Sequence, residues 1–247
     1  MSSLTKVISP QSKVWFIQNE SREDPGFFLD LLKEWSVPFE IRDAQLPHSL
    51  PDVGARDAVI ILGGPMSAND QTDSMRALLS WLRMLLKKNI PCLGICLGLQ
   101  TLVKAAGGQV IRNPVKEIGL RMDGGNSFTC DLTPAARKDP LLEGLPEQFP
   151  IFQLHGETVE LDNSMVLLAE GKTCRNQIVK IRNLVYGLQG HLEITRRLLS
   201  SWIKEDADLK TVDSQKLLRD MSETESELHL NCRKILMNFL KIAKMIS

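Results

Sequence analysis

Residues 91–106 read Pro-Cys-Leu-Gly-Ile-Cys-Leu-Gly-Leu-Gln-Thr-Leu-Val-Lys-Ala-Ala, and this stretch decides the expected fold. Pro91–Ile95 is a short apolar run, typical of a strand that is covered on both faces. Leu97–Ala106 continues as a helix, which Gly107 and Gly108 close. The sequence therefore predicts a strand that turns directly into a helix, with Cys96 at the turn.

The residues before this stretch repeat the same alternation of apolar strands and amphipathic helices. Strands are expected at Lys13–Gln18, Val37–Ile41 and Ala58–Leu62, and helices at Pro25–Trp35 and around Met75–Leu86. Strand–helix–strand alternation implies right-handed crossovers and parallel pairing. We therefore expect an α/β fold with an open, mostly parallel sheet and helices on both faces.

From about Gln109 the pattern changes to shorter β-like runs, which predict added antiparallel strands and connecting loops. These runs are residues 128–133, 151–155, 165–170, 177–181 and 183–189. Leu192–Ile203 is expected to be helical, and Lys204–His229 is polar and mostly acidic. Asn231–Ser247 has apolar residues on one side and is expected to be a helix that packs on the body, with docking to a partner protein as the alternative. We expect one domain over residues 1–205 and a helical extension over residues 206–247 that packs on it.

The composition is that of an ordinary globular protein and argues against several function classes. Thirty Lys and Arg balance thirty Asp and Glu, so a basic nucleic-acid-binding footprint is not expected. No apolar run approaches the roughly 20 residues that span a bilayer, and the first residues carry no apolar signal-peptide core. Five cysteines without a CxxC spacing favour a reducing compartment. We therefore expect a cytoplasmic protein with no nucleic-acid or membrane partner.

Gly94–Gly98 has the form G-x-C-x-G, the cysteine version of a nucleophile elbow. A tight strand-to-helix turn strains the backbone of the nucleophile and exposes its side chain, and the flanking glycines avoid a clash with neighbouring backbone. The N-terminus of the following helix points at the sulfur and favours the thiolate. Cys96 is therefore the candidate nucleophile, whereas the other four cysteines lie at no such turn and are expected to be structural.

A thiolate that performs acyl transfer needs a general base, and the base needs a group that orients it. In His191-Leu192-Glu193, residues two apart in an extended segment face the same side, so Glu193 can orient His191 toward Cys96. His155 is left open as an alternative base or as part of the pocket wall. His48 and His229 are expected to be solvated.

The oxyanion that forms during acyl transfer needs hydrogen-bond donors. The strand exit Gly63-Gly64-Pro65 has no side chain to keep a substrate carbonyl away from its backbone N–H groups. The N–H of Leu97, directly after the nucleophile, is the second expected donor.

Four segments together resemble the class I, triad-type glutamine amidotransferases, and in particular stand-alone proteins similar to the amidotransferase domain of GMP synthase. They are Gly63-Gly64-Pro65, Gly94–Gln100, Leu154–Thr158 and Tyr186–Glu193, and the resemblance covers about Lys13–Ile203. It implies a flavodoxin-like fold in which Cys96 attacks the glutamine side-chain amide, His191 protonates the departing ammonia and Glu193 orients His191. It also implies an oxyanion hole at Gly64 and Leu97, and substrate binding by Gly63, Gln100, Leu154, His155 and Gly156.

The resemblance implies no metal and no organic cofactor for this half-reaction. A phosphate loop of the form G-x-x-x-x-G-K-[ST] is absent from the sequence, so an ammonia-accepting synthase is expected on another protein. The family usually has Phe-His-Pro-Glu where this chain has Gly190–Glu193, and these departures are expected to loosen the segment that carries the base. The leading prediction is a glutaminase or amidotransferase. The alternatives are a γ-glutamyl peptidase with the same triad and a degenerate interaction module.

Overall fold

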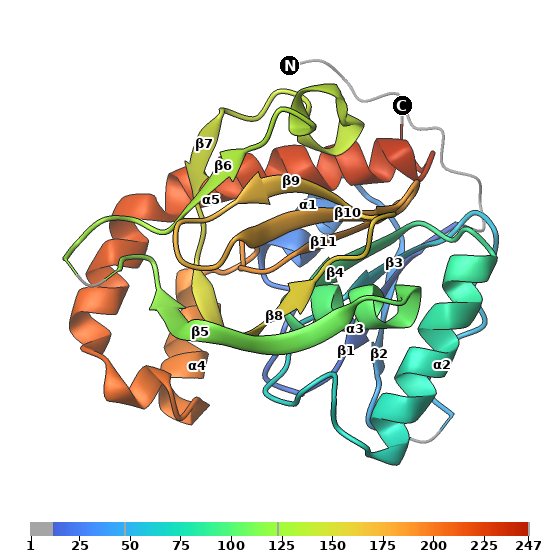
Figure 1. Ribbon diagram of the computed structural model, residues 1–247, viewed down its shortest axis with the longest axis horizontal. Helices are drawn as coiled ribbons and strands as arrows, with labels where there is room; N and C mark the ends of the chain where they lie inside the picture. The colour runs from blue at the N-terminus through green and yellow to red at the C-terminus, as the bar shows by residue number, and fades with distance from the viewer. Residues whose placement is uncertain (1–11, 47, 123, 247) are drawn as a thin grey trace.

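The computed structural model describes residues 12–46, 48–122 and 124–246. Its centre is a nine-stranded sheet in the order β2-β1-β3-β4-β11-β10-β9-β6-β7, accompanied by a two-stranded ribbon of β5 and β8 (Figure 1). The expected α/β class with added antiparallel strands is confirmed. The point at which parallel pairing changes to antiparallel pairing lies beside β4, the strand that carries the elbow.

The parallel half of the sheet contains the strands that the sequence predicts in the first hundred residues. They are β1 (Val14–Gln18), β2 (Phe39–Asp43), β3 (Ala58–Ile61), β4 (Cys92–Ile95) and, from the far end of the chain, β11 (Val185–Leu188). Alternate residues of each strand enter different apolar clusters: Phe16 and Ile60 face one side of the sheet, whereas Ile17 and Ile61 face the other. Burial on both faces explains why these strands are continuous apolar runs.

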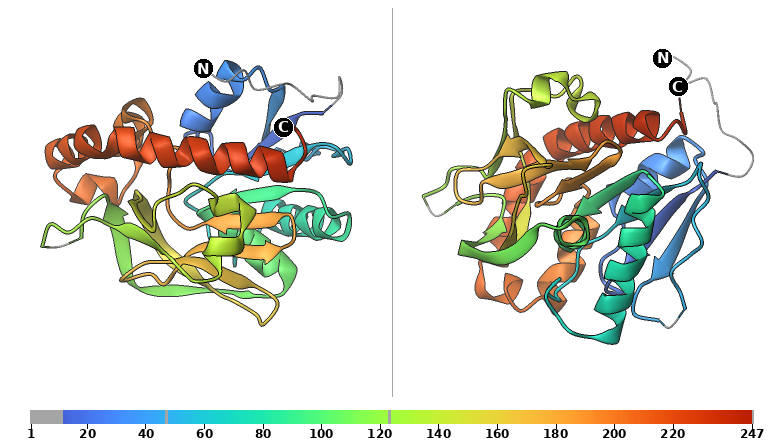
Figure 2. Two further views of the ribbon diagram at one scale, coloured as in Figure 1. Left: turned by 90° about the horizontal axis from the view of Figure 1, so that it is seen from above. Right: turned by 45° about the vertical axis from the view of Figure 1, so that its right-hand side comes forward.

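Helices cover both faces of the sheet, as expected. On one face lie α1 (Phe27–Glu34), α4 (Arg196–Glu205) and α5 (Ser214–Ile242), and on the other lie α2 (Asp73–Lys87) and α3 (Leu97–Ala106). Viewed from above, α5 and α1 lie together, apart from α2 and α3 (Figure 2). Thr72 caps α2 with its side-chain oxygen, and Gly107 ends α3 in a left-handed conformation.

The antiparallel half consists of β6 (Thr129–Leu132), β7 (Gln148–Pro150), β9 (Val166–Glu170) and β10 (Asn176–Arg182). The separate ribbon pairs β5 (Gln109–Gly119) with β8 (Gln153–Glu160) and crosses the edge of the molecule on the side of α3 (Figure 1). Three short 3₁₀ helices complete the described elements: Ala136–Lys138, Pro140–Leu142 and Leu209–Thr211.

Three boundaries differ from the sequence-based expectations. The run 183–189, expected among antiparallel additions, contains β11, which pairs parallel with β4 on one side and antiparallel with β10 on the other. Residues 192–195 are not helical, because α4 starts at Arg196 behind its cap Thr195. The last helix starts at Ser214, since Asp213 accepts hydrogen bonds from two amides of its first turn.

Helix α5 is part of the protein core. Ile235 and Phe239 have no exposed surface, and they belong to the same apolar cluster as Phe28 of α1. Arg233 forms two hydrogen bonds of 2.7 Å with the carboxylate of Glu34, also on α1. The apolar side of this helix is therefore covered by the chain itself, which disfavours the docking alternative.

His229 also differs from its expected solvated state. Its ring stacks on Phe27 at a centroid distance of 3.9 Å, and its Nε2 lies 2.9 Å from the carbonyl oxygen of Ile194. His48 is exposed, as expected. Within the described residues, no helix combines the length and the apolar character needed to cross a membrane.

Candidate active site

The elbow forms where β4 runs into α3. Cys96 has φ 52° and ψ −107°, a conformation outside the common regions for a residue with a side chain. Its N–H donates to the carbonyl oxygen of Leu188, and its own carbonyl oxygen accepts from Gln100 as the helix begins. Bonds on both sides therefore hold the strained turn in place.

The flanking glycines are required because backbone approaches them closely. A Cβ on Gly94 would lie 2.3 Å from the carbonyl carbon of Gly98, and a Cβ on Gly98 would lie 2.1 Å from the carbonyl oxygen of Ile61. These close approaches pack α3 tightly against β3 and β4. The glycine pattern of the elbow thus has a direct steric cause.

The sulfur of Cys96 lies at the wall of a cleft, and the residue is 6% exposed. Its Sγ is 3.8 Å from the carbonyl oxygen of Leu154 and 3.8 Å from Nε2 of Gln189. The remaining cysteines, Cys92, Cys130, Cys174 and Cys232, are free, at most 1% exposed and absent from the lining of the cleft.

His191 and Glu193 meet as the sequence spacing predicts. Nδ1 of His191 lies 2.6 Å from Oε1 of Glu193, and both side chains are almost completely buried. An antiparallel bridge with Phe152 fixes the backbone of His191, whose N–H donates to the Phe152 carbonyl at 2.7 Å. The edge of the His191 ring faces Trp202 at a centroid distance of 5.1 Å.

The surroundings of His191 change its proton affinity. Burial by itself lowers the pKa of the imidazole, but the Glu193 carboxylate and the neighbouring Cys96 sulfur together raise that pKa well above its ordinary value. The ring therefore holds a proton readily beside the sulfur. A proton on His191 is what a departing amine would need.

Gly64 follows β3 and lines the cleft. A Cβ on Gly64 would lie 3.0 Å from Leu97 Cδ2, so the two expected oxyanion donors are neighbours. Within the described part of the chain, neither the N–H of Gly64 nor that of Leu97 donates to a protein acceptor. Gly63 is not part of the cleft surface, because a Cβ there would meet Glu23 Oε2 at 2.9 Å and His191 Cε1 at 3.2 Å.

The expected substrate-binding strand is the start of β8. Leu154, His155 and Gly156 all border the cleft. Gln100, one helical turn after Cys96, donates from its Nε2 to the carbonyl oxygen of Glu157 at 3.1 Å. Gln100 therefore ties α3 to β8 while also lining the cleft.

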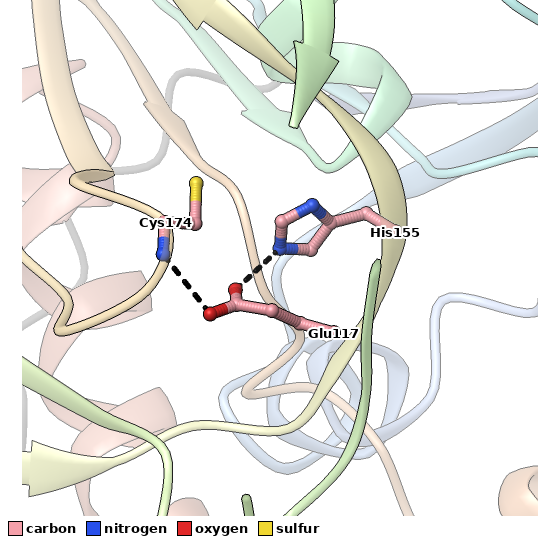
Figure 3. Close-up of side chains that lie close together, drawn as sticks. All are labelled: Glu117, His155 and Cys174. Carbon is pink, nitrogen blue, oxygen red and sulfur yellow. Dashed lines mark hydrogen bonds and ion pairs between the residues drawn. The ribbon is translucent and has the colours of Figure 1, made fainter. Parts of the chain in front are cut away.

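The side chain of His155 is neither a base for Cys96 nor an open pocket wall. It is 1% exposed, with its Nε2 2.9 Å from Oε2 of Glu117 and its Nδ1 3.0 Å from the carbonyl oxygen of Glu157. Glu117 also accepts a hydrogen bond from the backbone N–H of Cys174 (Figure 3). The imidazole thus links β8, through the Glu117 carboxylate, to β5 and to the loop at Cys174. Because the side chain is buried, His155 borders the cleft mainly with its backbone.

Glu117, His155 and Cys174 have the donor types of a metal site, with ligand atoms within 4.8 Å of one another. Their polar atoms are already occupied, since both ring nitrogens of His155 face oxygen acceptors and the Cys174 thiol lies 3.1 Å from the Thr158 hydroxyl. These hydrogen bonds explain why the three side chains lie close together, and they indicate a structural role for the cluster.

The cleft has a volume of about 930 Å³, and many of the residues that line it carry charged side chains. One wall carries the pair Arg22–Asp206 at 2.7 Å, and the rim carries Lys116–Asp208 at 2.7 Å. Glu23 lies between Arg22 and the Gly63 turn, and burial raises the pKa of its carboxyl to about 7, while His191 and Arg22 act in the opposite direction. Glu23 is not among the residues that the sequence predicts for the site, although an acid in a loop after the first strand is a usable signal.

The model of one protein family, described as "Glutamine amidotransferase class-I", matches residues 31–206. The chain belongs to this family. The class-I glutamine amidotransferase match includes every residue of the expected catalytic and substrate-binding set, from Gly63 to Glu193.

Two curated relatives match nearly the whole length of this amidotransferase chain. A putative glutamine amidotransferase-like protein, YfeJ, of Salmonella typhimurium is 25% identical over 92% of this chain and 95% of its own length. Gamma-glutamyl peptidase 3 of Arabidopsis thaliana is 26% identical over 85% of this chain and 83% of its own length. GMP synthases of two Thermosipho species also match, and the chain spans a third of their length.

A solved glutamine amidotransferase structure from Methylobacillus flagellatus superposes with a TM-score of 0.79 and 26% identity. It covers 93% of this chain and 94% of its own chain. The resemblance to class I amidotransferases that the motifs indicate is therefore confirmed at the level of family and fold.

The departure from the family pattern at Gly190 has a steric explanation. A Cβ on Gly190 would lie 2.6 Å from the carbonyl oxygen of Phe152, so this position has no room for a larger residue. Phe152 and Trp202 supply aromatic surface beside His191, and Leu192 is fully buried. The segment that carries His191 is thus buried and bridged to Phe152, and its expected loosening stays a prediction.

Proposed function

We propose that this protein hydrolyses γ-glutamyl amides through a covalent thioester on Cys96. The observation that carries the proposal is the position of Cys96, at a strained turn in the wall of a cleft that His191 also lines. His191 is in turn hydrogen-bonded to Glu193. A nucleophile, a base and a group that orients the base are the parts that acyl transfer requires.

In the proposed reaction the Cys96 thiolate attacks the side-chain carbonyl carbon, and a C–S bond forms. The N–H groups of Gly64 and Leu97 hold the negative oxygen of the tetrahedral intermediate. The intermediate collapses with cleavage of the C–N bond, and His191 gives its proton to the departing amine. Water, deprotonated by His191, then attacks the thioester and releases glutamate and the thiolate.

The size of the cleft favours a substrate larger than glutamine. A volume of about 930 Å³ lies near the top of the roughly 300–1,000 Å³ range of sites that enclose drug-sized ligands. The γ-glutamyl group fills the part between Cys96 and β8, so the remainder is available to the leaving amine. The leading candidate is therefore a γ-glutamyl peptidase, the activity named for the Arabidopsis relative.

Glutamine hydrolysis with ammonia release for a synthase on another protein is the second candidate. It is favoured by the similarity to the Thermosipho GMP synthases, which are named as glutamine-hydrolysing enzymes. The two candidates share the same thioester and differ in the leaving group. They are therefore separated by the choice of substrate and not by the residues of the triad.

The test is a substrate screen with glutamine, glutathione and other γ-glutamyl peptides, in which glutamate, ammonia and released peptide are quantified. We expect γ-glutamyl peptides to have the higher kcat/KM and Cys96→Ser to abolish all turnover. Rapid glutamine hydrolysis that peptides do not match would favour the glutaminase. A well-folded protein that releases glutamate from no substrate would refute the proposal.

Covalent labelling provides a test that does not depend on the best substrate. Burial raises the pKa of Cys92, Cys130 and Cys232, and raises that of Cys174 to about 11, so these four remain thiols at neutral pH. A glutamine-like diazoketone should label Cys96 alone, as mapped by peptide mass spectrometry. Labelling at Cys174 with Cys96 unmodified would contradict the assignment.

A further inference from the structure

Asn19 follows directly after β1 and has no exposed surface. Its Nδ2 donates to the carbonyl oxygen of Leu62 at 2.8 Å and to that of Gly63 at 3.3 Å. Carbonyl oxygens only accept hydrogen bonds, so the end of the amide that faces them must be the NH₂ group. The side chain is therefore hydrogen-bonded to two consecutive peptide groups directly after β3.

The other end of the same amide has no partner. Within the described residues, Oδ1 of Asn19 is buried and accepts no hydrogen bond. An unpaired buried acceptor typically costs about 1–3 kcal/mol. Asn19 is thus bonded to the surrounding structure through its NH₂ group and not through its side-chain oxygen.

One of these two peptide groups, the one between Gly63 and Gly64, includes the expected oxyanion donor. The oxygen of Gly63 and the N–H of Gly64 belong to one peptide group, and no peptide bond in the described chain is cis. In a trans peptide these two groups point in opposite directions. A hydrogen bond that draws the Gly63 oxygen toward Asn19 therefore turns the Gly64 N–H away from Asn19.

The residues on either side of this peptide make its orientation easier to change. The peptide is flanked by two glycines, which rotate more freely than residues with a Cβ. Neighbouring atoms confirm the placement, because a Cβ on Gly64 would lie 3.1 Å from Cβ of Asn19 and 3.0 Å from Cδ2 of Leu97. Gly64 thus lies next to both Asn19 and the start of α3.

We propose that Asn19 is a positioning residue for the oxyanion hole, whose amide orients the Gly63–Gly64 peptide so that the Gly64 N–H faces the substrate carbonyl. The inference rests on the proposed hydrolysis of γ-glutamyl amides. Loss of an oxyanion donor outright lowers kcat roughly 100- to 1,000-fold. Loss of its orientation alone leaves the donor present part of the time, so the expected reduction is about 10- to 100-fold.

The experiment compares Asn19→Ala and Asn19→Asp with wild type on the best γ-glutamyl substrate. Asn19→Asp keeps the shape of the side chain but removes the NH₂ group: an ionised carboxylate donates no hydrogen bond and a protonated carboxyl group donates only one, so this variant decides the matter if Asn19→Ala fails to fold. The matched control is Asn238→Ala. Asn238 is also buried and also donates from Nδ2 to two backbone carbonyls, those of Leu141 and Glu143, both at 2.9 Å, but it lies on α5.

The decisive readouts are kcat, KM and inhibition by the γ-semialdehyde of glutamate, which adds reversibly to the thiol and places its oxygen in the hole. The Asn19 variants should lose about 10- to 100-fold in kcat and a similar factor in semialdehyde affinity, with KM changed less than about threefold. Asn238→Ala should lower the melting temperature and leave kcat unchanged. A purely structural role for Asn19 would instead change kcat no more than the control does.

Two negative results are distinguishable. Active wild-type protein combined with folded Asn19 variants of unchanged kcat and semialdehyde affinity would overturn the positioning role and leave the proposed function intact. Wild-type protein that cleaves no γ-glutamyl amide would refute the proposed function, and the inference would be refuted with it.

Discussion

Nδ1 of His191 and Oε1 of Glu193 lie 2.6 Å apart, although the two residues are on a non-helical segment of the chain and are separated by one residue. Both side chains are buried, and the backbone of His191 is fixed by its bridge to Phe152. The pair is therefore formed in the free chain. The proposed catalysis therefore does not require a partner to bring His191 and Glu193 together.

Glu193→Gln should lower kcat at least about 100-fold, the usual scale for loss of general acid–base catalysis. The neutral amide removes the charge that raises the pKa of His191, and it leaves the size of the side chain unchanged. Steady-state kinetics would measure the effect. His155→Ala is the comparison, because its ring contacts Glu117 and not Cys96, and it should raise KM and reduce stability more than it lowers kcat. The reverse pattern would contradict the assignment of the base.

Gly98→Ala should destabilise the protein by about 3 kcal/mol or more, or prevent folding. The added Cβ would lie 2.1 Å from the carbonyl oxygen of Ile61, and neither backbone can move without separating α3 from β3. Chemical denaturation would measure the loss. Gly54→Ala is the matched control, since the nearest atom to its Cβ is an Asp57 carboxylate oxygen at 3.3 Å. Equal stability of the two variants would contradict the close approach of the Ile61 backbone to Gly98.

Glu23→Gln should stabilise the protein at alkaline pH and have little effect at acidic pH. The folded pKa of about 7 lies above the ordinary 4.5, so the folded state holds a proton that the unfolded state has released between these values. Stability therefore falls as pH rises from about 4.5 to 7 and stays lower above it. The neutral amide of the Glu23→Gln variant removes this loss of stability, which amounts to up to about 3 kcal/mol. Urea unfolding at pH 5 and pH 8 would test it, and an equal effect at both would contradict it.

Phe239→Ala should cost about 3–5 kcal/mol in unfolding free energy, because the ring is fully buried in the main apolar cluster. Leu230→Ala on the same helix is the control, since Leu230 is 61% exposed and its loss should change stability by less than about 0.5 kcal/mol. If the last helix instead served to dock a partner, Phe239→Ala would leave the stability of the free protein unchanged.

Local patterns in the sequence were sufficient for the elbow and for the pairing of His191 with Glu193. Both depend on contacts between residues close in the chain: a strand that turns into a helix between glycines, and two side chains on the same side of an extended segment. The apolar runs at β1, β3 and β4 were predictable for a similar reason, because burial on both faces leaves no polar position in the strand. The family resemblance came from the same short segments.

The role of His155 required the tertiary structure. The sequence places it beside the substrate-binding strand, but its partner Glu117 is 38 residues away, and the ribbon of β5 and β8 brings the two together. The start of α5 was missed because its first half is polar. That half is helical through its Asp213 cap and contacts such as the ion pair of Arg121 with Asp220.

The sequence by itself determined the fold class and the family, and it predicted the nucleophile, the base and the orienting acid, because each of these signals lies in residues a few positions apart. The tertiary structure alone decided which groups surround them: Asn19 behind the Gly63–Gly64 peptide, Glu23 beside His191, and a cleft larger than glutamine needs. These contacts join segments that are distant in the chain. Local propensity carries no information on such pairs, whose proximity depends on how the β-strands and helices pack together.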